Sequence, residues 1–436
     1  MWAYNSVFYQ IYPLGLCGAP AENDGQTLPR IRRLLDWTGH IRRTGATAVY
    51  LCPLFQSDSH GYDTRDYRVL DCRLGANADL KEVCDAFHAA GLRVVLDGVF
   101  NHVGRGFWAF QDLLQNRESS PYKDWFYVDF GGDSPYHDGF WYEGWEGHYE
   151  LVKLNLRNPA VVEHLLEAVR FWIDTFGIDG LRLDVAYMLD KDFIRRLRAF
   201  CDGCKPDFFL VGEMLHGDYN QLLADGMLHS VTNYECYKGL YSSFNSLNLF
   251  EIAHSLNRQF GPEPWTLYKG RHLLNFADNH DVTRLASILQ NPRHLPLLYA
   301  LLFAMPGIPC LYYGSEWGIK GEKSQGDAAL RPALERPEEN ELTRFIAACA
   351  AAHRTEPALS QGDYQTVLLT NRQFIFRRQW EGRQVLIAVN ADESSFHAGF
   401  SAGFSAAKDL LSGQIYTLDG GLEPPPYSAF YLVPAV

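Results

Sequence analysis

The sequence has no apolar stretch of the length that crosses a membrane, about 18 consecutive residues, so no transmembrane helix is expected. Its first six residues, Met-Trp-Ala-Tyr-Asn-Ser, lack the basic segment and the following apolar run of a signal peptide. Both absences argue against a secreted or membrane-bound protein. They favour the cytoplasm as the compartment.

An excess of basic charge is also missing. The chain has 39 Lys and Arg against 52 Asp and Glu, and its formal net charge is −13. Nucleic acids and anionic membrane surfaces attract basic faces, so neither is an expected partner. The sequence leaves the oligomeric state open.

The nine cysteines form no disulfide framework, because their number is odd and they are scattered along the chain. Several lie in apolar runs, where cysteine packs as a small hydrophobic residue. The single Cys201-Asp-Gly-Cys204 motif has neither a second cysteine pair nor a histidine partner, so neither a zinc site nor a redox site is predicted there. Unpaired cysteines agree with a reducing cytoplasm.

What the sequence does contain is a repeated alternation of strand and helix patterns. With 436 residues, 47% of them hydrophobic, the chain can form one large α/β barrel and a small additional domain. Helices are expected at Leu28–Thr44, Ala78–Ala90, Pro159–Phe176, Leu240–Phe260 and Glu339–Ala352. The expected strands are Ser6–Pro13, Thr47–Pro53, Arg93–Val99, Gly180–Ala186, Phe208–Met214, Ser230–Tyr234, Leu273–Asn279 and Ile308–Gly314.

Eight strands separated by helices predict a (β/α)8 TIM barrel. The stretch 103–153 interrupts this rhythm with many Gly, Asp, Tyr and Trp residues, and it is interpreted as a subdomain inserted after the third strand. This insertion, which is rich in tryptophan (Trp125, Trp141 and Trp145), is expected to form one wall of a cleft. Short alternating runs after Leu359 predict a C-terminal antiparallel β-sandwich. The predicted domains are therefore the barrel (1–102 and 154–358), the insertion (103–153) and the sandwich (359–436).

Several of the expected strands end on a carboxylate. Asp184 and Glu213 follow neighbouring strands, and Asp281 follows a later one. A parallel barrel gathers such residues at its C-terminal face, where its active sites lie. Each carboxylate alone could equally be a salt-bridge partner or a helix cap, but their repetition at strand ends favours a catalytic cleft.

Two carboxylates across a cleft are the minimal apparatus for glycoside hydrolysis. Arg182 lies two residues before Asp184, on the same face of the strand, and should hold it ionised. Glu213 has no cation beside it in the sequence. An apolar wall there would keep it protonated, as a general acid requires.

Four segments resemble the conserved regions of the α-amylase family, glycoside hydrolase family 13. They are Asp97–His102, Gly180–Asp184, Gly212-Glu213 and Asn279–Asp281, in the family's order along the chain. The resemblance implies that Asp184 is the nucleophile, Glu213 the acid/base and Asp281 the stabiliser of the transition state. It further implies that the reacting glucose is held by Tyr62, His102, Arg182 and His280. Retention of anomeric configuration predicts catalytic carboxyl groups about 5–5.5 Å apart.

A finer resemblance is to the neopullulanase, cyclomaltodextrinase and maltogenic amylase group. It rests on Leu151–Asn155, on Val211–His216, which ends at the candidate substrate-binding residue His216, and on Pro306–Glu316. Asp327 and Arg331 have the spacing of a pair that contacts the next glucose in that group. The chain opens directly on the first barrel strand, without the N-terminal β-domain of many members, which puts their mode of dimerisation in doubt.

Tyr187 and Met188 also depart from the family pattern, on the leaving-group side of the site. An apolar pair there should weaken the polar grip on a long chain, and Tyr187 could stack on a sugar. Many relatives bind calcium, and Glu22–Gly25 could be such a loop, although Asn-Asp-Gly is also an ordinary turn. No metal and no other cofactor is predicted.

The predicted function is therefore retaining hydrolysis of α-1,4-glucosidic bonds in an oligosaccharide substrate, such as a short maltooligosaccharide or a cyclodextrin. Two alternatives remain. The same site could transfer the sugar to another sugar, or the chain could be a non-catalytic carbohydrate-binding relative, which the intact carboxylates argue against.

Overall fold

Eight parallel strands form one sheet at the centre of the computed structural model, which describes residues 1–435. Their order around the sheet is β13-β12-β11-β5-β2-β1-β15-β14. The strands are β1 (Phe8–Ile11), β2 (Ala48–Leu51), β5 (Arg93–Gly98), β11 (Gly180–Leu183), β12 (Phe209–Gly212), β13 (Ser230–Val231), β14 (Leu274–Phe276) and β15 (Ile308–Tyr312).

The two ends of this sheet meet at β13 and β14. A single bridge between Thr232 and Leu274 joins them, and the Asn233 N–H donates to the Leu274 carbonyl at 2.9 Å. The Asn233 side chain continues the contact, since its Nδ2 lies 3.0 Å from Oδ1 of Asn275 and 2.9 Å from Oε1 of Gln259. The sheet is thus closed into a barrel, and the predicted fold class is confirmed.

Helices follow the barrel strands, and the long ones cover the outside of the barrel. They are α1 (Pro13–Leu16), α2 (Arg33–Arg43), α3 (Asn77–Ala89), α5 (Pro159–Phe176), α6 (Lys191–Cys204), α7 (Tyr234–Ser246), α8 (Phe250–Phe260), α9 (Leu285–Ile288), α10 (His294–Ala304), α11 (Asp327–Leu330), α12 (Glu341–Thr355) and α13 (Pro357–Gln361). The sequence defines α5 sharply: Asn158 caps its first turn, Pro159 occupies its first position and Gly177 ends it in the left-handed conformation. No helix within residues 1–435 combines the length and the apolarity that a membrane span requires.

The single helix predicted over Leu240–Phe260 is wrong. Leu247 adopts a left-handed conformation, with φ of 50°, and this ends α7 three residues before α8 begins. The Ser243 hydroxyl then accepts the N–H of Ile252 at 2.9 Å, which ties the start of α8 to α7. No glycine marks the break, so the sequence pattern gave no stop signal there.

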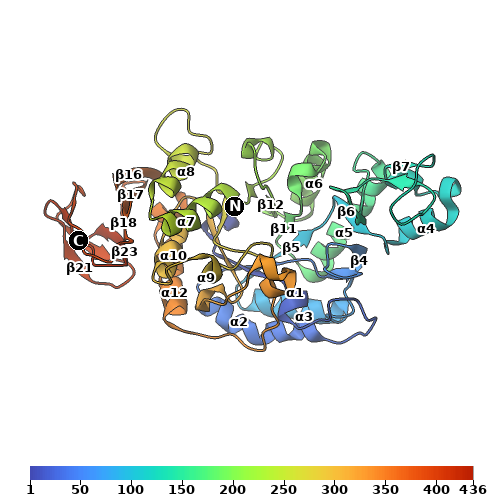
Figure 1. Ribbon diagram of the computed structural model, residues 1–436, viewed down its shortest axis with the longest axis horizontal. Helices are drawn as coiled ribbons and strands as arrows, with labels where there is room; N and C mark the ends of the chain where they lie inside the picture. Colours follow the sequence, from blue (N-terminus) through green and yellow to red (C-terminus); the bar gives the residue numbers. More distant parts are fainter. Residues whose placement is uncertain (436) are drawn as a thin grey trace.

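The insertion lies at one end of the elongated molecule and the C-terminal sheet at the other, with the barrel between them (Figure 1). The insertion contains the helix α4 (Trp108–Asn116), which the sequence pattern did not predict. Its strands are β6 (His102–Gly104), β7 (Val128–Asp129), β8 (Trp141–Tyr142), β9 (Gly144–Trp145) and β10 (His148–Lys153). A separate hairpin, β3 (Phe55–Ser57) and β4 (Thr64–Leu70), follows β2 and carries Tyr62 in its loop.

The C-terminal region forms a six-stranded antiparallel sheet and a two-stranded sheet. Side chains from both sheets, among them Ile375, Leu386 and Leu422, share a small core. On the opposite face of the large sheet, Phe374 and Phe376 belong to the main core of the barrel. The strands are β16 (Asp363–Leu369), β17 (Gln373–Trp380), β18 (Arg383–Asn390), β19 (Ala398–Gly399), β20 (Ala406–Asp409), β21 (Ile415–Thr417), β22 (Gly421–Leu422) and β23 (Ser428–Pro434).

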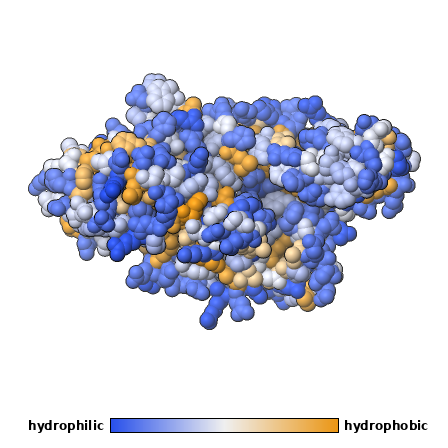
Figure 2. Space-filling view, viewed as in Figure 1, coloured by the Kyte–Doolittle hydropathy of each residue, from blue (hydrophilic) through white to orange (hydrophobic). Residues whose placement is uncertain are grey.

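Because the large sheet is covered on both faces, its central strands consist largely of consecutive apolar residues. The helix α10 is apolar on every side for the same reason, since it lies between the barrel and this sheet. The face of the molecule seen in Figure 2 is mostly hydrophilic, with apolar side chains in separate groups.

Candidate active site

The C-terminal ends of β5, β11 and β12 bring four charged side chains together. Arg182 lies in register with Asp97 on one neighbouring strand and with Val211 on the other. Asp184 and Glu213 follow the last residues of β11 and β12. All four charged side chains are buried, each less than 9% exposed.

Arg182 contacts all three carboxylates. Its Nη1 lies 2.8 Å from Oδ1 of Asp184 and 3.0 Å from Oδ1 of Asp97, and its Nη2 lies 2.8 Å from Oε1 of Glu213. One guanidinium therefore spans Asp184 and Glu213, which keeps their carboxyl groups close together. The separation of about 5–5.5 Å expected of a retaining enzyme stays a prediction.

Glu213 has a cation beside it that its sequence neighbours did not indicate. Besides its ion pair with Arg182, Glu213 accepts the backbone N–H of Val185 at Oε2, at 3.0 Å. Val185 adopts a left-handed conformation with φ of 47°, which is costly for a β-branched residue. This strained residue, directly after Asp184, thus turns its N–H toward the second carboxylate.

The expectation that Arg182 holds Asp184 ionised also needs correction. Burial raises the pKa of Asp184 well above its usual value, Arg182 opposes that shift, and the carboxylates of Glu213 and Asp97 add to it. Three carboxylates share one cation, so the cluster favours keeping a proton. A retaining site needs one protonated and one ionised carboxyl group, and a cluster that keeps a proton is suited to this need.

Asp97 has no predicted role, yet it lies at the base of the cluster. Its Oδ2 accepts the hydroxyl of Tyr50 at 2.9 Å, and both of its oxygens contact Nη1 of Arg182. It therefore orients Arg182 from below. The sequence signal that marks Asp184, an apolar strand ending on a carboxylate, also marks Asp97 and could have identified it.

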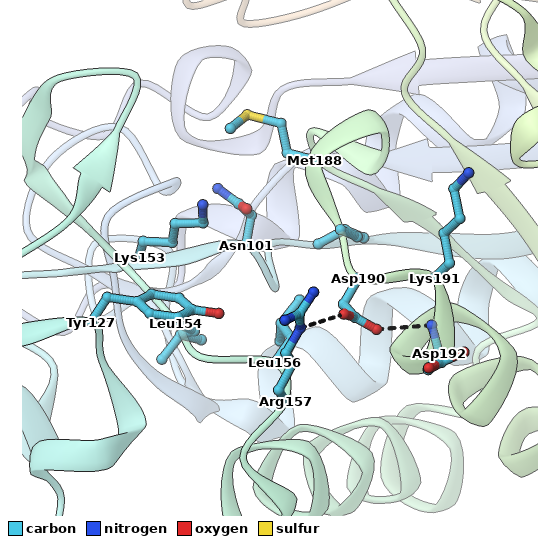
Figure 3. A pocket seen from close by; sticks show the side chains of 11 residues that line it. Asn101, Tyr127, Lys153, Leu154, Leu156, Arg157, Met188, Asp190, Lys191 and Asp192 are labelled. Atoms are coloured by element: carbon cyan, nitrogen blue, oxygen red, sulfur yellow. Dashed lines mark hydrogen bonds and ion pairs between the residues drawn. The ribbon is translucent and has the colours of Figure 1, made fainter.

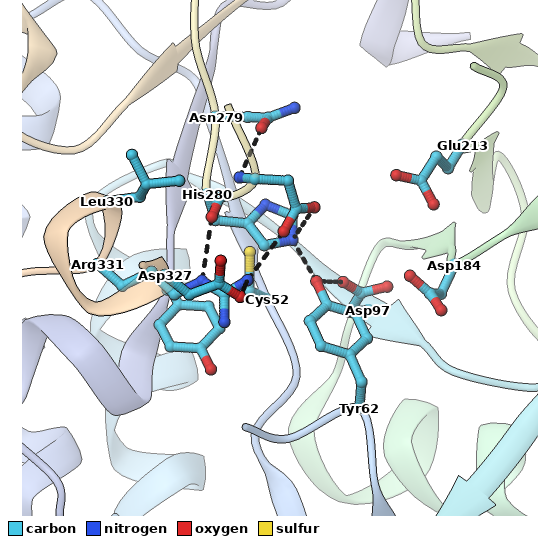
Figure 4. A network of polar contacts seen from close by, with 12 residues as sticks. Cys52, Tyr62, Asp97, Asp184, Glu213, Asn279, His280, Asp327, Leu330 and Arg331 are labelled. Carbon is cyan, nitrogen blue, oxygen red and sulfur yellow. Dashed lines mark hydrogen bonds and ion pairs between the residues drawn. The ribbon is translucent and has the colours of Figure 1, made fainter. Parts of the chain in front are cut away.

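His280 lies across the site from Asp184 and Glu213 (Figure 4), and Asp281 pairs with it. Nε2 of His280 lies 2.9 Å from Oδ2 of Asp281 and also contacts the hydroxyl of Tyr62. Burial opposes protonation of His280, but the Asp281 carboxylate outweighs it and raises the pKa of His280 to about 10. Burial alone would raise the pKa of Asp281, but His280 and Arg331 bring it well below its usual value.

His102 is held neutral beside the nucleophile candidate. Burial lowers its pKa to about 3. Asn101 Nδ2 lies 3.2 Å from its Nδ1, which leaves Nε2 as the donor, 3.9 Å from Oδ2 of Asp184. Within residues 1–435 this Nε2 is buried without a hydrogen-bond partner, as is Nε1 of Trp145. Both donors belong to side chains that line the cleft, where sugar hydroxyls can accept from them.

Asp327 and Arg331 lie beside this group. Nη2 of Arg331 contacts Oδ1 of Asp281 at 2.8 Å and Oδ2 of Asp327 at 3.1 Å. Lys323, which no motif indicated, pairs with the other oxygen of Asp327 at 2.5 Å. The loop after β15 thus brings a chain of alternating charges to the edge of the cleft.

These side chains surround a cleft of about 480 Å³. Seven of the ten predicted site residues line it. Arg182 and His280 do not line the cleft, but each contacts a carboxylate that does. His216 is the exception: it lines an adjacent cavity of about 460 Å³, with its ring 5.9 Å from that of Tyr187. The lining residues without a predicted role are His60, His148, Glu150, Leu151, Val185, Leu215, Tyr234 and Lys323.

The insertion contributes Trp145, His148, Glu150 and Leu151 to the wall of the cleft, so of its three named tryptophans only Trp145 lines it. Trp125 is buried in the insertion, and Trp141 lies outside the cleft on an exposed strand. Tyr187 lines the cleft, whereas Met188 lines a separate cavity of about 440 Å³ together with Lys153, Asn101 and Tyr127 (Figure 3). The two residues of the apolar pair therefore face different spaces.

The side chains of the Glu22–Gly25 turn accept hydrogen bonds from its own backbone. Oδ1 of Asn23 accepts the N–H of Gly25 at 3.0 Å, and Oδ1 of Asp24 accepts that of Gln26 at 3.1 Å. Within residues 1–435, no three His, Cys, Asp or Glu side chains converge as a metal site would need. The side-chain oxygens of this turn stabilise its own backbone, as in an ordinary Asx turn.

The sequence and the fold were compared with known proteins. A family model described as "Alpha amylase, catalytic domain" matches residues 10–357. The chain belongs to the α-amylase family. Within this family it is 30% identical over 419 residues to a cyclomaltodextrinase from Bacillus sp, covering 90% of this chain and 74% of that protein. It is 34% identical to neopullulanase 2 from Thermoactinomyces vulgaris, covering 79% of this chain and 61% of that protein.

A solved family structure has the same architecture over its whole length. The ligand-free cyclic alpha-maltosyl-(1→6)-maltose hydrolase from Arthrobacter globiformis superimposes with a TM-score of 0.85 at 29% identity, covering 100% of both chains. Its barrel, insertion and C-terminal sheet therefore correspond to those described above.

Proposed function

We propose that the protein is a retaining glycoside hydrolase that cleaves α-1,4-glucosidic bonds in short maltooligosaccharides and cyclodextrins. The observation that carries the proposal is the placement of Asp184 and Glu213 on a single guanidinium, at 2.8 Å each, in a cleft of about 480 Å³. The names of the similar proteins support the same substrate class.

In this proposal Asp184 attacks the anomeric carbon while Glu213 gives its proton to the leaving glycosidic oxygen. A covalent β-glucosyl enzyme results, and water then enters, loses a proton to Glu213 and releases the sugar from Asp184. Asp281, paired with His280 and Arg331, supplies negative charge opposite the developing oxocarbenium ion. The free Nε2–H of His102 and the Tyr62 hydroxyl face the sugar.

Two substitutions test these roles. Asp184→Asn and Glu213→Gln should each remove nearly all turnover of maltotriose and γ-cyclodextrin, measured by product chromatography. Asp192→Asn is the matched control, because its side chain is 92% exposed and pairs only with Arg195 among the described residues. Activity near that of the unmodified protein in either cleft variant, with the control active, would overturn the assignment.

Transfer to a second sugar is the other candidate reaction. The apolar side chains Leu151, Tyr187 and Leu215 line the cleft, and apolar walls favour a sugar acceptor over water. If transfer occurs, products longer than the substrate should accumulate at high maltotriose concentration. If every product is shorter than the substrate at all concentrations, transfer to a second sugar is excluded.

We also propose the cytoplasm as the compartment. All nine cysteines are free thiols in the structure, as a reducing environment would keep them. Localisation of a tagged chain by cell fractionation tests this, and recovery from the medium would contradict it.

A further inference from the structure

A second cavity, of about 210 Å³, lies at the other end of the barrel strands, where the barrel meets the C-terminal sheet. Gly270–His272 enter β14 here and Pro306-Gly307 enter β15, so this is the face opposite the catalytic cleft. The remaining wall comes from the ends of α8 and α13, from the start of β16, which lies beside α8 (Figure 1), and from the end of β17.

Arg378 on β17 lines this cavity and is only 1% exposed. Its Nη1 donates to the Ala304 carbonyl at 2.6 Å, and its Nη2 donates to that of Gly362 at 2.8 Å. No carboxylate among residues 1–435 lies within the 4.0 Å of an ion pair with it. Burial lowers the pKa of Arg378 to about 9. A buried cation satisfied only by carbonyl dipoles lacks a counter-charge.

The cavity wall holds further basic groups. Lys269 has one acidic neighbour, Asp363, at 3.9 Å, and Arg271 has no ion-pair partner among the described residues. Nδ1 of His272 is buried without a hydrogen-bond partner, and its ring stacks on Tyr4 at 4.1 Å. Burial, with Arg378 adding to it, lowers the pKa of His272 to about 4, so the ring is neutral.

These basic side chains gather here although the formal net charge of the whole protein is −13. An adjoining cavity, also of about 210 Å³, shares Gly270–His272 and adds Arg198, which pairs with Asp202, and Asp225. Lysine and arginine therefore outnumber acidic side chains in the joined walls by four to two, with Asp363 and Asp225 as the acidic ones. A cavity whose wall has an excess of one charge sign concentrates ions of the opposite sign.

We propose that the cavity beside Arg378 binds a small oxyanion, a phosphate group that is either free or carried by a sugar. Arginine forks match the geometry of phosphate oxygens, and Lys269 adds a point charge. Asp363 is the one acidic side chain in the lining and is 73% exposed, so it can turn toward solvent when the anion enters. The bound anion would join the barrel to the C-terminal sheet through Arg378.

Calorimetric titration of the full chain with inorganic phosphate, at ionic strength fixed with NaCl, tests the proposal. One phosphate should bind per chain. The double variant Lys269→Gln/Arg271→Gln should weaken binding about 100-fold, since each charge-assisted hydrogen bond contributes a factor of about ten or more. Both side chains are exposed, so the double variant should fold.

The matched control is Lys81→Gln/Arg195→Gln, which removes the same charge from exposed helix positions that pair only with Asp85 and Asp192. Absence of phosphate binding, or equal weakening in both double variants, would overturn the proposal. Binding is measured without turnover, so this proposal and the hydrolase assignment can fail separately.

A parallel titration with glucose 6-phosphate separates the two sources of the anion. Tighter binding than inorganic phosphate, lost in the Lys269→Gln/Arg271→Gln variant, would identify a phosphorylated sugar. Equal affinity would identify the phosphate group alone. Binding of both ligands that survives in this variant would place them elsewhere and contradict the proposal.

Discussion

Nη2 of Arg182 lies 2.8 Å from Oε1 of Glu213, and this contact links the acid/base candidate to the strand that ends in the nucleophile candidate. The same guanidinium also contacts Asp184 and Asp97. A planar group with five fixed donors can serve three carboxylates at once, whereas an ammonium group is a single point charge.

Arg182→Lys should therefore lower kcat/KM by roughly 10- to 150-fold, because a charge-assisted hydrogen bond contributes roughly 1.5–3 kcal/mol and at least one is lost. Steady-state kinetics on maltotriose measures the change. Arg105→Lys is the matched control, since Arg105 forms a similar fork with Asp138 in the insertion. If Arg182→Lys is as active as Arg105→Lys, the geometry of the Arg182 guanidinium does not matter for catalysis.

The His280–Asp281 pair predicts a pH-dependent stability. The pKa of His280 is raised from its ordinary value of about 6.5 to about 10, so folding favours its protonated form. The contribution is fully present below about pH 6.5 and is lost as the pH rises through 10. The free energy of unfolding of the unmodified protein should exceed that of His280→Gln most at pH 6 and least above pH 10.

Urea unfolding of both proteins at pH 6, 8 and 10.5 measures this difference. His294→Gln is a suitable control, because burial lowers the pKa of His294 and its stability difference should not shrink over the same range. A difference between the unmodified protein and His280→Gln that stays constant with pH would contradict a protonated His280.

Trp145 should act on substrate binding more than on chemistry. It lines the cleft, its ring lies 5.7 Å from that of His102, and its Nε1 is buried without a partner. Trp145→Ala should raise KM roughly 3- to 10-fold, in line with about 0.5–1.5 kcal/mol for an aromatic contact, with a smaller effect on kcat. Trp141→Ala, on the same insertion but outside the cleft, should leave both constants unchanged; equal effects of the two would refute the prediction.

Trp172 on α5 should be a main source of stability. Its side chain is fully buried, stacks on Phe55 at 4.5 Å and donates to the Tyr67 carbonyl at 2.7 Å. Trp172→Ala should lower the free energy of unfolding by about 3–5 kcal/mol, whereas Trp172→Phe should cost less because it keeps an aromatic ring. Urea unfolding at pH 7 compares the two variants. An equal loss in the free energy of unfolding would show that the aromatic ring is not the source of the stabilisation.

Much of this architecture could be predicted from the sequence, because strand and helix periods recur and each buried strand brings its last polar residue to the same face of the barrel. Asp184, Glu213 and Asp281 follow directly from that rule. The positions of loop residues cannot be predicted in this way, because a loop has no repeating pattern. His216 and Met188, for example, line neighbouring cavities instead of the cleft. The turn at Leu247 has no glycine, so the end of α7 could not be seen.

The closing seam of the barrel has a consequence for how the molecule responds to acid. Asn233 joins Asn275 and Gln259 through amide groups, which carry no charge and do not titrate. The catalytic end of the same barrel depends on carboxylates and a histidine that do. Acidification should therefore abolish activity while the barrel is still closed. Returning the protein to neutral pH should then restore activity without refolding.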